Sequence, residues 1–167
     1  MKFILGLIIG LLIVPAGTYL YFRLGYAPVA TAEGPMPFET QIARTALKVR
    51  VEKESPKKTA IAVSPENLIA GAKIYHDNCA FCHGFKGQDK TPAAEGMFPK
   101  PPQLFTGHGV TDDPPGETYW KAANGIRLTG MPAYKQTLSD QQMWQVSVML
   151  ANADKLPDEA VTIVSTK

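Results

Sequence analysis

The sequence is poor in cysteine and histidine, with two cysteines and three histidines among its 167 residues. A disulfide between Cys79 and Cys82 would close so short a loop that it would add little stability. A structural zinc site usually takes four ligands, and the usual second pair is missing here, although His76 and His108 exist elsewhere in the chain. The two cysteines are therefore expected to serve another purpose.

Clustered charge is also missing. The net charge is +2, with 8 Lys and Arg against 4 Asp and Glu in residues 1–63, and 9 against 11 in residues 64–167. No run of Lys and Arg interleaved with aromatic residues occurs in residues 64–167, so nucleic-acid binding is not indicated. Asp112 and Asp113 lie in a proline-rich stretch where they are expected to be solvated, so no acid–base constellation supports a small-molecule enzyme acting alone.

The N-terminal segment has no charged residue between Lys2 and Arg23. As a helix, Phe3–Phe22 would span about 30 Å, the hydrocarbon thickness of a bilayer. A cleaved signal peptide is the rival interpretation, since Ala30–Ala32 resembles a cleavage site, but its apolar core would be unusually long. We expect residues 1–26 to be a single transmembrane anchor of the bacterial inner membrane. With so short an N-terminus, the remainder should lie on the periplasmic side, in an oxidising compartment.

Residues 27–63 are rich in proline and charge, which predicts a linker. Phe38, Ile42, Ala46 and Leu47 recur at helical spacing, so a short amphipathic helix within residues 38–54 could lie on the membrane surface or on a partner. A partly ordered linker with solvated charges is the alternative for the same residues.

Helix signals begin at Ser64, a candidate N-cap followed by Pro65 at the first helical position. The first helix should run to about Asp77. A last helix is indicated by the capping box of Ser139 and Gln142 and the apolar stripe that follows. With a shorter helix at about 117–124, these elements predict an all-α domain over residues 64–156, followed by a C-terminal tail, 157–167.

The middle of this domain, residues 84–118, is rich in Gly and Pro and offers few large apolar side chains. Such a long irregular segment is unusual in a compact domain, so another group should fill the core. The segment DNCAFCHGFKG, residues 77–87, supplies one: C-x-x-C-H is the attachment motif of a covalent c-type haem, in which two thiols bond the vinyl groups of the porphyrin. A redox-active C-x-x-C would instead be expected in a βαβ setting.

The segment GAKIYHDNCAFCHG resembles the first helix and haem motif of class I c-type cytochromes, with Gly71, Tyr75 and Cys79 at the family's recurring positions. The resemblance covers about residues 64–156. It implies three to four helices around one haem, with Gly71 letting the first helix cross closely over the last, where it would face Trp144 or Val148.

The same resemblance implies the iron ligands. His83 would be one, and NGIRLTGMPAY is similar to the family's methionine loop, which makes Met131 the other. Met97 and His108 are the competing candidates for the second position. PPQLF resembles the family's Pro-x-Leu segment, whose proline carbonyl accepts from the axial histidine and whose leucine packs on the haem. By this match Pro102 orients His83, and Leu104 lines the pocket. The residues that precede the methionine and could hydrogen-bond the haem propionates are Tyr119, Trp120, Asn124 and Arg127.

An iron ligated by both histidine and methionine has no open position for substrate, and a thioether ligand raises the reduction potential. The expected function is therefore electron transfer by a membrane-anchored monohaem cytochrome c that shuttles single electrons between redox protein complexes at the periplasmic face, with no small-molecule substrate. The alternative is a permanent haem c subunit of a larger membrane oxidoreductase. A haem-based sensor would require Met131 to dissociate readily.

Overall fold

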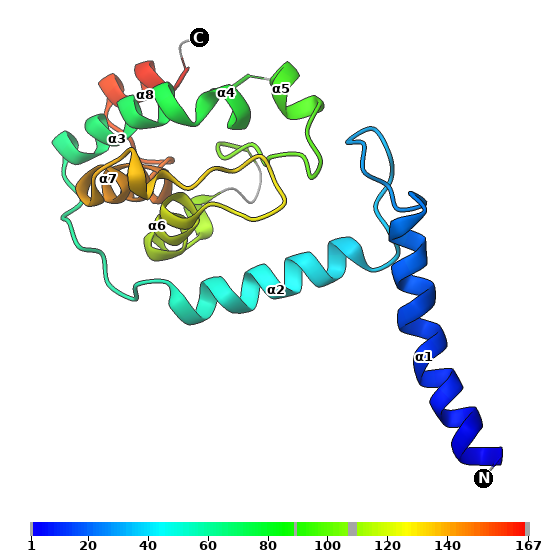
Figure 1. The fold of residues 1–167 in the computed structure, drawn as a ribbon. Coiled ribbons are helices and arrows are strands. Elements are labelled where there is room, and N and C mark those ends of the chain that lie inside the picture. The colour runs from blue at the N-terminus through cyan, green and yellow to red at the C-terminus, as the bar shows by residue number, and fades with distance from the viewer. Residues whose placement is uncertain (1, 89, 107–109, 166–167) are drawn as a thin grey trace. The chain divides into compact units, whose positions relative to one another are not determined.

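The computed structural model describes residues 2–88, 90–106 and 110–165, and every regular element within them is helical (Figure 1). The expected all-α fold is therefore confirmed. The chain divides into two compact units, residues 1–42 and residues 43–167, which are described separately.

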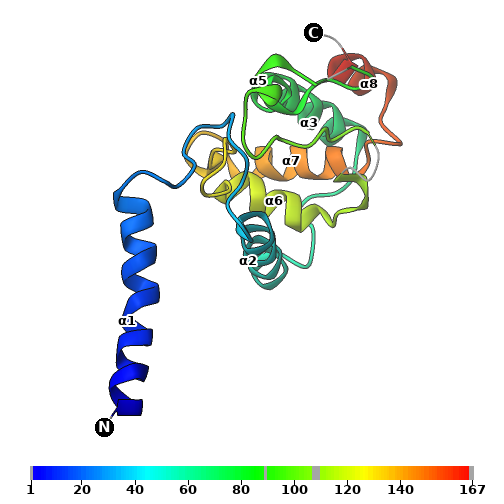
Figure 2. The ribbon, with the colours of Figure 1, turned by 90° about the vertical axis from the view of Figure 1, so that its right-hand side faces the viewer.

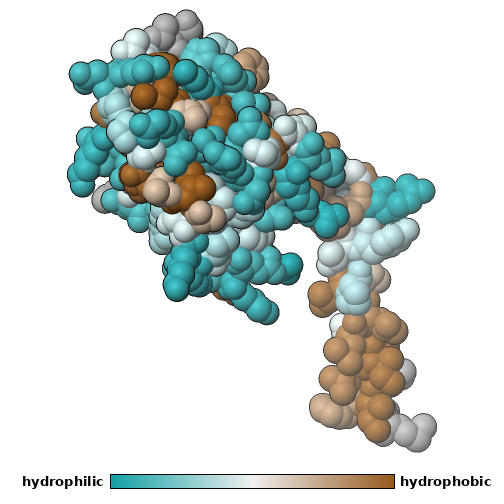
Figure 3. Space-filling model, turned by 90° about the vertical axis from the view of Figure 1, so that its left-hand side faces the viewer, coloured by the Kyte–Doolittle hydropathy of each residue, from teal (hydrophilic) through white to brown (hydrophobic). Residues whose placement is uncertain are grey.

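The first unit is dominated by helix α1 (Lys2–Arg23). Its segment Gly6–Arg23 is long and apolar enough to cross a membrane, and none of that segment is buried within the structure. Figure 3 shows an almost continuous hydrophobic surface along this helix. A single N-terminal apolar helix is thus present, as expected. Its retention as an anchor is still a prediction, because a signal sequence shares these properties.

Helix α2 (Glu39–Glu54) forms within the segment where a short amphipathic helix was expected. Its C-terminal end belongs to the second unit, because Val51 is buried and the indole N–H of Trp120 donates to Glu54 at 3.1 Å. The chain then passes so close to helix α6 (Pro115–Asn124) that a Cβ on Gly116 would lie 2.0 Å from the Pro56 carbonyl oxygen. The second unit accordingly begins at Ala43, before the expected domain start at residue 64.

The core of the second unit is built from helices α3 (Pro65–Asn78) and α7 (Asp140–Ala151), with α6 packed against α7 (Figures 1 and 2). Both N-terminal caps predicted from sequence are present. The Ser64 hydroxyl accepts from the Asn67 N–H, and Ser139 and Gln142 form the reciprocal capping box. These caps satisfy backbone donors that helix formation leaves without partners, so they set where each helix begins.

Gly71 lies where α3 crosses α7. A Cβ at this position would lie 2.2 Å from the Gln145 carbonyl oxygen and 2.7 Å from the Met149 Cβ. The close crossing matches the expectation, but Gly71 faces Gln145 and Met149 instead of Trp144 or Val148. A rotation of one residue, about 100° around α7, accounts for the difference.

The C-terminal segment, expected to be a tail, contains helix α8 (Asp158–Ser165), which packs on α3. Ala160 and Val164 are fully buried, and the Lys86 N–H donates to the Val164 carbonyl at 2.8 Å. The helix therefore supports both α3 and the segment that follows the C-x-x-C-H motif.

Within the described residues of the glycine- and proline-rich middle, the regular elements before α6 are short. They are α5 (Pro92–Glu95) and the 3-10 helix η1 (Val110–Asp112). The short helix α4 (Ala80–His83) lies directly before this segment, and a second 3-10 helix, η2 (Tyr134–Gln136), precedes α7. Residues 96–106 are irregular, and they border the cavity described below.

Replacing Gly71 with Ala should lower the free energy of unfolding by about 2–3 kcal/mol, because the added methyl group must push α3 away from the α7 backbone. Gly96→Ala is the matched control, since the nearest atoms to its Cβ would be 3.8 Å away. Chemical denaturation of the two haem-containing variants measures the difference. Equal stability of the two would contradict the close-crossing argument.

Candidate functional site

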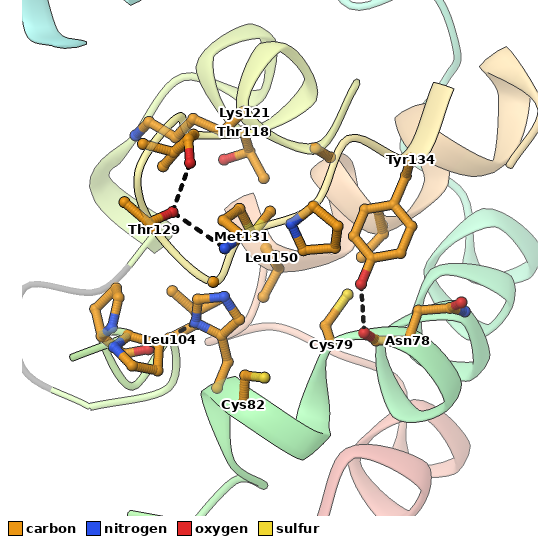
Figure 4. Close-up of a pocket in the computed structure, with 18 of the residues that line it drawn as sticks. Asn78, Cys79, Cys82, Leu104, Thr118, Lys121, Thr129, Met131, Tyr134 and Leu150 are labelled. Carbon is orange, nitrogen blue, oxygen red and sulfur yellow. Dashed lines mark hydrogen bonds between the residues drawn. The ribbon is translucent and has the colours of Figure 1, made fainter. Parts of the chain in front are cut away.

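A cavity of about 290 Å³ lies inside the second unit, and its walls are mainly apolar (Figure 4). Cys79, Cys82 and His83 border it from the junction of α3 and α4, while Met131 borders it from the loop that precedes η2. The structure therefore brings together the four residues to which the sequence assigned attachment and ligation.

The two cysteines occupy one turn of backbone. Cys79 ends α3 and precedes α4, and its carbonyl accepts from the N–H groups of Cys82 at 3.1 Å and His83 at 2.9 Å. Both side chains are free thiols that line the cavity. Burial raises the pKa of the Cys79 thiol to about 12, and the neighbouring charge of Cys82 acts in the same direction. The apolar surroundings therefore favour the neutral form of this thiol.

His83 is oriented by the backbone of the middle segment. Its Nδ1 lies 2.8 Å from the carbonyl oxygen of Pro102, the acceptor that the family resemblance implies. A carbonyl oxygen can only accept, so Nδ1 carries the hydrogen and Nε2 keeps a lone pair available for a metal. Burial lowers the pKa of His83, which the Pro102 contact opposes. Leu104 lies beside Pro102 in the cavity wall, also as the resemblance implies.

The Met131 loop is closed by its own hydrogen bonds. The Thr129 hydroxyl donates to the Ile126 carbonyl at 2.7 Å and accepts from the Met131 N–H at 3.1 Å, while the Ile126 N–H donates to the Met131 carbonyl at 3.1 Å. Gly125 has a φ of 66°, and a Cβ there would lie 2.8 Å from the Met131 carbonyl oxygen. Glycine is therefore required at the start of this tight loop.

The competing ligands differ in their positions. Met97 lines the same cavity, and its Sδ would lie 3.1 Å from a Cβ on Gly130. His108 lies outside the described residues. Met97 is thus close to the Met131 loop and borders the same cavity.

Tyr134 is a cavity residue that sequence reasoning missed. Its hydroxyl donates to the Asn78 carbonyl at 2.6 Å, which joins the Met131 loop to the end of α3 directly before Cys79. Burial raises the pKa of Tyr134 to about 12, assisted by the charges of Cys79 and Cys82. The sequence signal that could have identified Tyr134 is an aromatic residue three positions after Met131.

Four predicted pocket residues lie elsewhere. Tyr119 stacks on Trp144 with ring centroids 4.3 Å apart. The Trp120 indole N–H donates to Glu54, and the Asn124 side chain donates to the Trp120 carbonyl within α6. Arg127 is exposed. None of the four lines the cavity. The helical repeat explains this result, because α6 presents Thr118, Lys121 and Ala122 at i, i+3 and i+4 to the cavity. The residues between them point in other directions.

Comparison with known proteins shows the family of this domain. Residues 66–148 match the family model described as cytochrome c oxidase, cbb3-type, subunit III. These residues form a monohaem c-type cytochrome domain. A domain of this family transfers electrons through one covalently attached haem c that contains iron, so the expected cofactor and the recognised family are confirmed.

A solved structure is also similar to part of the cytochrome chain. It belongs to the reducing HAO-like protein complex of Kuenenia stuttgartiensis, with 27% sequence identity and a TM-score of 0.47. The similarity covers 56% of this chain and 47% of that one, so this chain spans about half the length of its neighbour. The comparison with curated proteins finds no match.

The cavity of the cytochrome domain suits a haem. Two thiols one turn apart face the same space as an imidazole with a free Nε2 and a thioether loop, and the remaining walls are largely apolar. Within the described residues, no cluster of three or more His, Cys, Asp or Glu residues offers an alternative metal site. The donor set thus fits a porphyrin with one imidazole and one thioether.

Replacing Tyr75 with Phe should destabilise the cytochrome domain by about 1–3 kcal/mol, because the Tyr75 hydroxyl donates to the buried Gly84 carbonyl at 2.6 Å, directly after His83. Tyr119→Phe is the matched comparison. The Tyr119 hydroxyl donates to Asp140 near the surface, where water can replace it, so its loss should cost about 0.5 kcal/mol or less. Denaturant unfolding of both variants should show this order, and the reverse order would contradict it.

Proposed function

We propose that the protein is a membrane-anchored monohaem cytochrome c that carries single electrons between redox protein complexes at the periplasmic face of the bacterial inner membrane. Cys79 and Cys82 attach the haem, and His83 and Met131 ligate its iron. The observation that carries this proposal is the shared cavity of these four residues within a c-type cytochrome domain.

The bound haem supplies a one-electron couple between ferrous and ferric iron. The residues of the chain hold it in a fixed environment. The Pro102 carbonyl accepts from His83 Nδ1 and so leaves the Nε2 lone pair available, and the hydrogen bonds of Thr129 stiffen the loop that presents Met131. With His83 and Met131 both held in this way, the iron of a bound haem would change oxidation state with little rearrangement of these residues, and it would have no open position for a substrate.

Replacing Met131 with Ala should abolish the far-red methionine–iron absorption band of the ferric protein. It should also allow the ferrous protein to bind carbon monoxide rapidly, because one axial position opens. The wild-type protein should react slowly with carbon monoxide, whereas a gas sensor would react rapidly.

Met36→Ala, at a methionine outside the cavity, should keep the band and serves as the methionine control. Loss of the band in Met97→Ala, with Met131→Ala unchanged, would assign the ligand to Met97 and overturn the proposed ligand set.

A permanent subunit of a membrane oxidoreductase is the second candidate, and the structure supplies an observation that favours it. The end of α2 packs into the cytochrome unit through Val51 and the contact between Glu54 and Trp120. The irregular chain between α1 and α2 is then residues 24–38, which as a random coil would reach only about 20–23 Å. The whole of residues 27–63 would reach about 30–37 Å. A shorter tether restricts how far the domain can travel between partners.

Extraction of the native membrane with a mild detergent, followed by size measurement, separates these candidates. A freely shuttling cytochrome should elute as a small detergent-bound species, because weak electron-transfer interfaces do not survive dilution. Stable co-elution of the haem absorbance with other subunits would establish the permanent-subunit alternative instead.

A further inference from the structure

Thr118 carries an unusual buried hydroxyl. Its Oγ1 is the single buried side-chain nitrogen or oxygen in the described residues that has no hydrogen-bond partner. The residue is 7% exposed and lines the haem cavity from α6. Burying a hydroxyl without a partner is unfavourable, so the position indicates that a group bound in the cavity completes its hydrogen bonding.

Lys121 lies one helical turn further along α6, on the same face. Its side chain is 27% exposed and lines the cavity, with Nζ 3.0 Å from the Asp113 carboxylate and 4.0 Å from that of Glu117. An ammonium group has three donors, so contact with Asp113 leaves Lys121 able to donate to a further acceptor. A neutral donor and a cation therefore border the same end of the cavity.

The position of this pair relative to the cysteines matters. Figure 4 shows Thr118 and Lys121 on the wall opposite Cys82, with Met131 between the two walls. In a haem, the vinyl-derived carbons that bond to the thiols and the two propionates lie toward opposite edges of the porphyrin. The propionate carboxylates are charged acceptors that match a hydroxyl and an ammonium donor.

We propose that Thr118 Oγ1 and Lys121 Nζ bind a haem propionate. This inference deepens the proposed haem site and rests on it. It replaces the four expected propionate partners, since none of them lines the cavity, namely Tyr119, Trp120, Asn124 and Arg127. Asp113 also lines the cavity, and the positive charge of Lys121 offsets the repulsion between its carboxylate and the propionate.

Resonance Raman spectroscopy of the full-length, haem-containing protein in detergent tests the proposal, because the propionate bending band responds to hydrogen bonds at the carboxylate. Thr118→Val removes the hydroxyl with little change in volume and should shift the band, whereas Thr118→Ser should restore the wild-type position. Lys121→Met should shift the band as well and lower the midpoint potential, because a positive charge near the iron disfavours the ferric state.

Lys73→Met is the matched control for Lys121→Met. Lys73 is 62% exposed, pairs with Glu159 and does not line the haem cavity, so its replacement should leave the Raman band unchanged. A shift in this control equal to that of Lys121→Met would overturn the assignment.

The visible spectrum of each variant is recorded first, because it reports on the proposed haem ligation independently of the propionate. A normal ligation spectrum with an unshifted propionate band in Thr118→Val overturns this inference and leaves the proposed function intact. If Thr118→Val does not accumulate as folded protein, the Raman band of Lys121→Met tests the inference instead. An unchanged propionate band in that variant would also overturn it.

Discussion

The close contact between Gly71 and the α7 backbone positions the whole haem site. Without a side chain at residue 71, α3 approaches α7 so closely that a Cβ would lie 2.2 Å from the Gln145 carbonyl oxygen. That crossing sets how α3 lies against α7, and Cys79, at the end of α3, lines the cavity. The end of α3 and the Met131 loop are also joined at the cavity itself, where the Tyr134 hydroxyl donates to the Asn78 carbonyl. The residues proposed for attachment and ligation thus lie on two segments that this helix packing and this hydrogen bond hold together.

The irregular segments hold their positions through specific backbone contacts. The Pro102 carbonyl fixes the ring of His83 from the middle segment, and Thr129 closes the loop of Met131 from the other side. A long loop can therefore contribute to a rigid site, because its few essential atoms are hydrogen-bonded to the elements that bear the ligands. This rigidity suits a function in which the iron changes charge without changing its ligands.

Two segments outside the matched residues 66–148 extend the cytochrome domain. Helix α8 covers α3 and accepts from the Lys86 N–H through the Val164 carbonyl. The end of α2 contributes the buried Val51 and the hydrogen bond from Trp120 of α6 to Glu54. The irregular chain between α1 and α2, residues 24–38, is accordingly shorter than the linker of residues 27–63 expected from composition. A shorter tether limits the distance that the domain can move.

Local patterns were sufficient to predict the apolar helix, both capped helices and haem attachment at the C-x-x-C-H motif. Each of these depends on neighbouring residues and on a spacing of a few positions. Contacts between distant segments required the folded structure. The face of α7 that meets Gly71, the incorporation of α2 and α8, and the side of α6 that lines the cavity all depend on how helices rotate and pack against one another. Thr118 and Lys121 were missed for this reason, since a difference of one residue in helix phase separates a cavity wall from a surface.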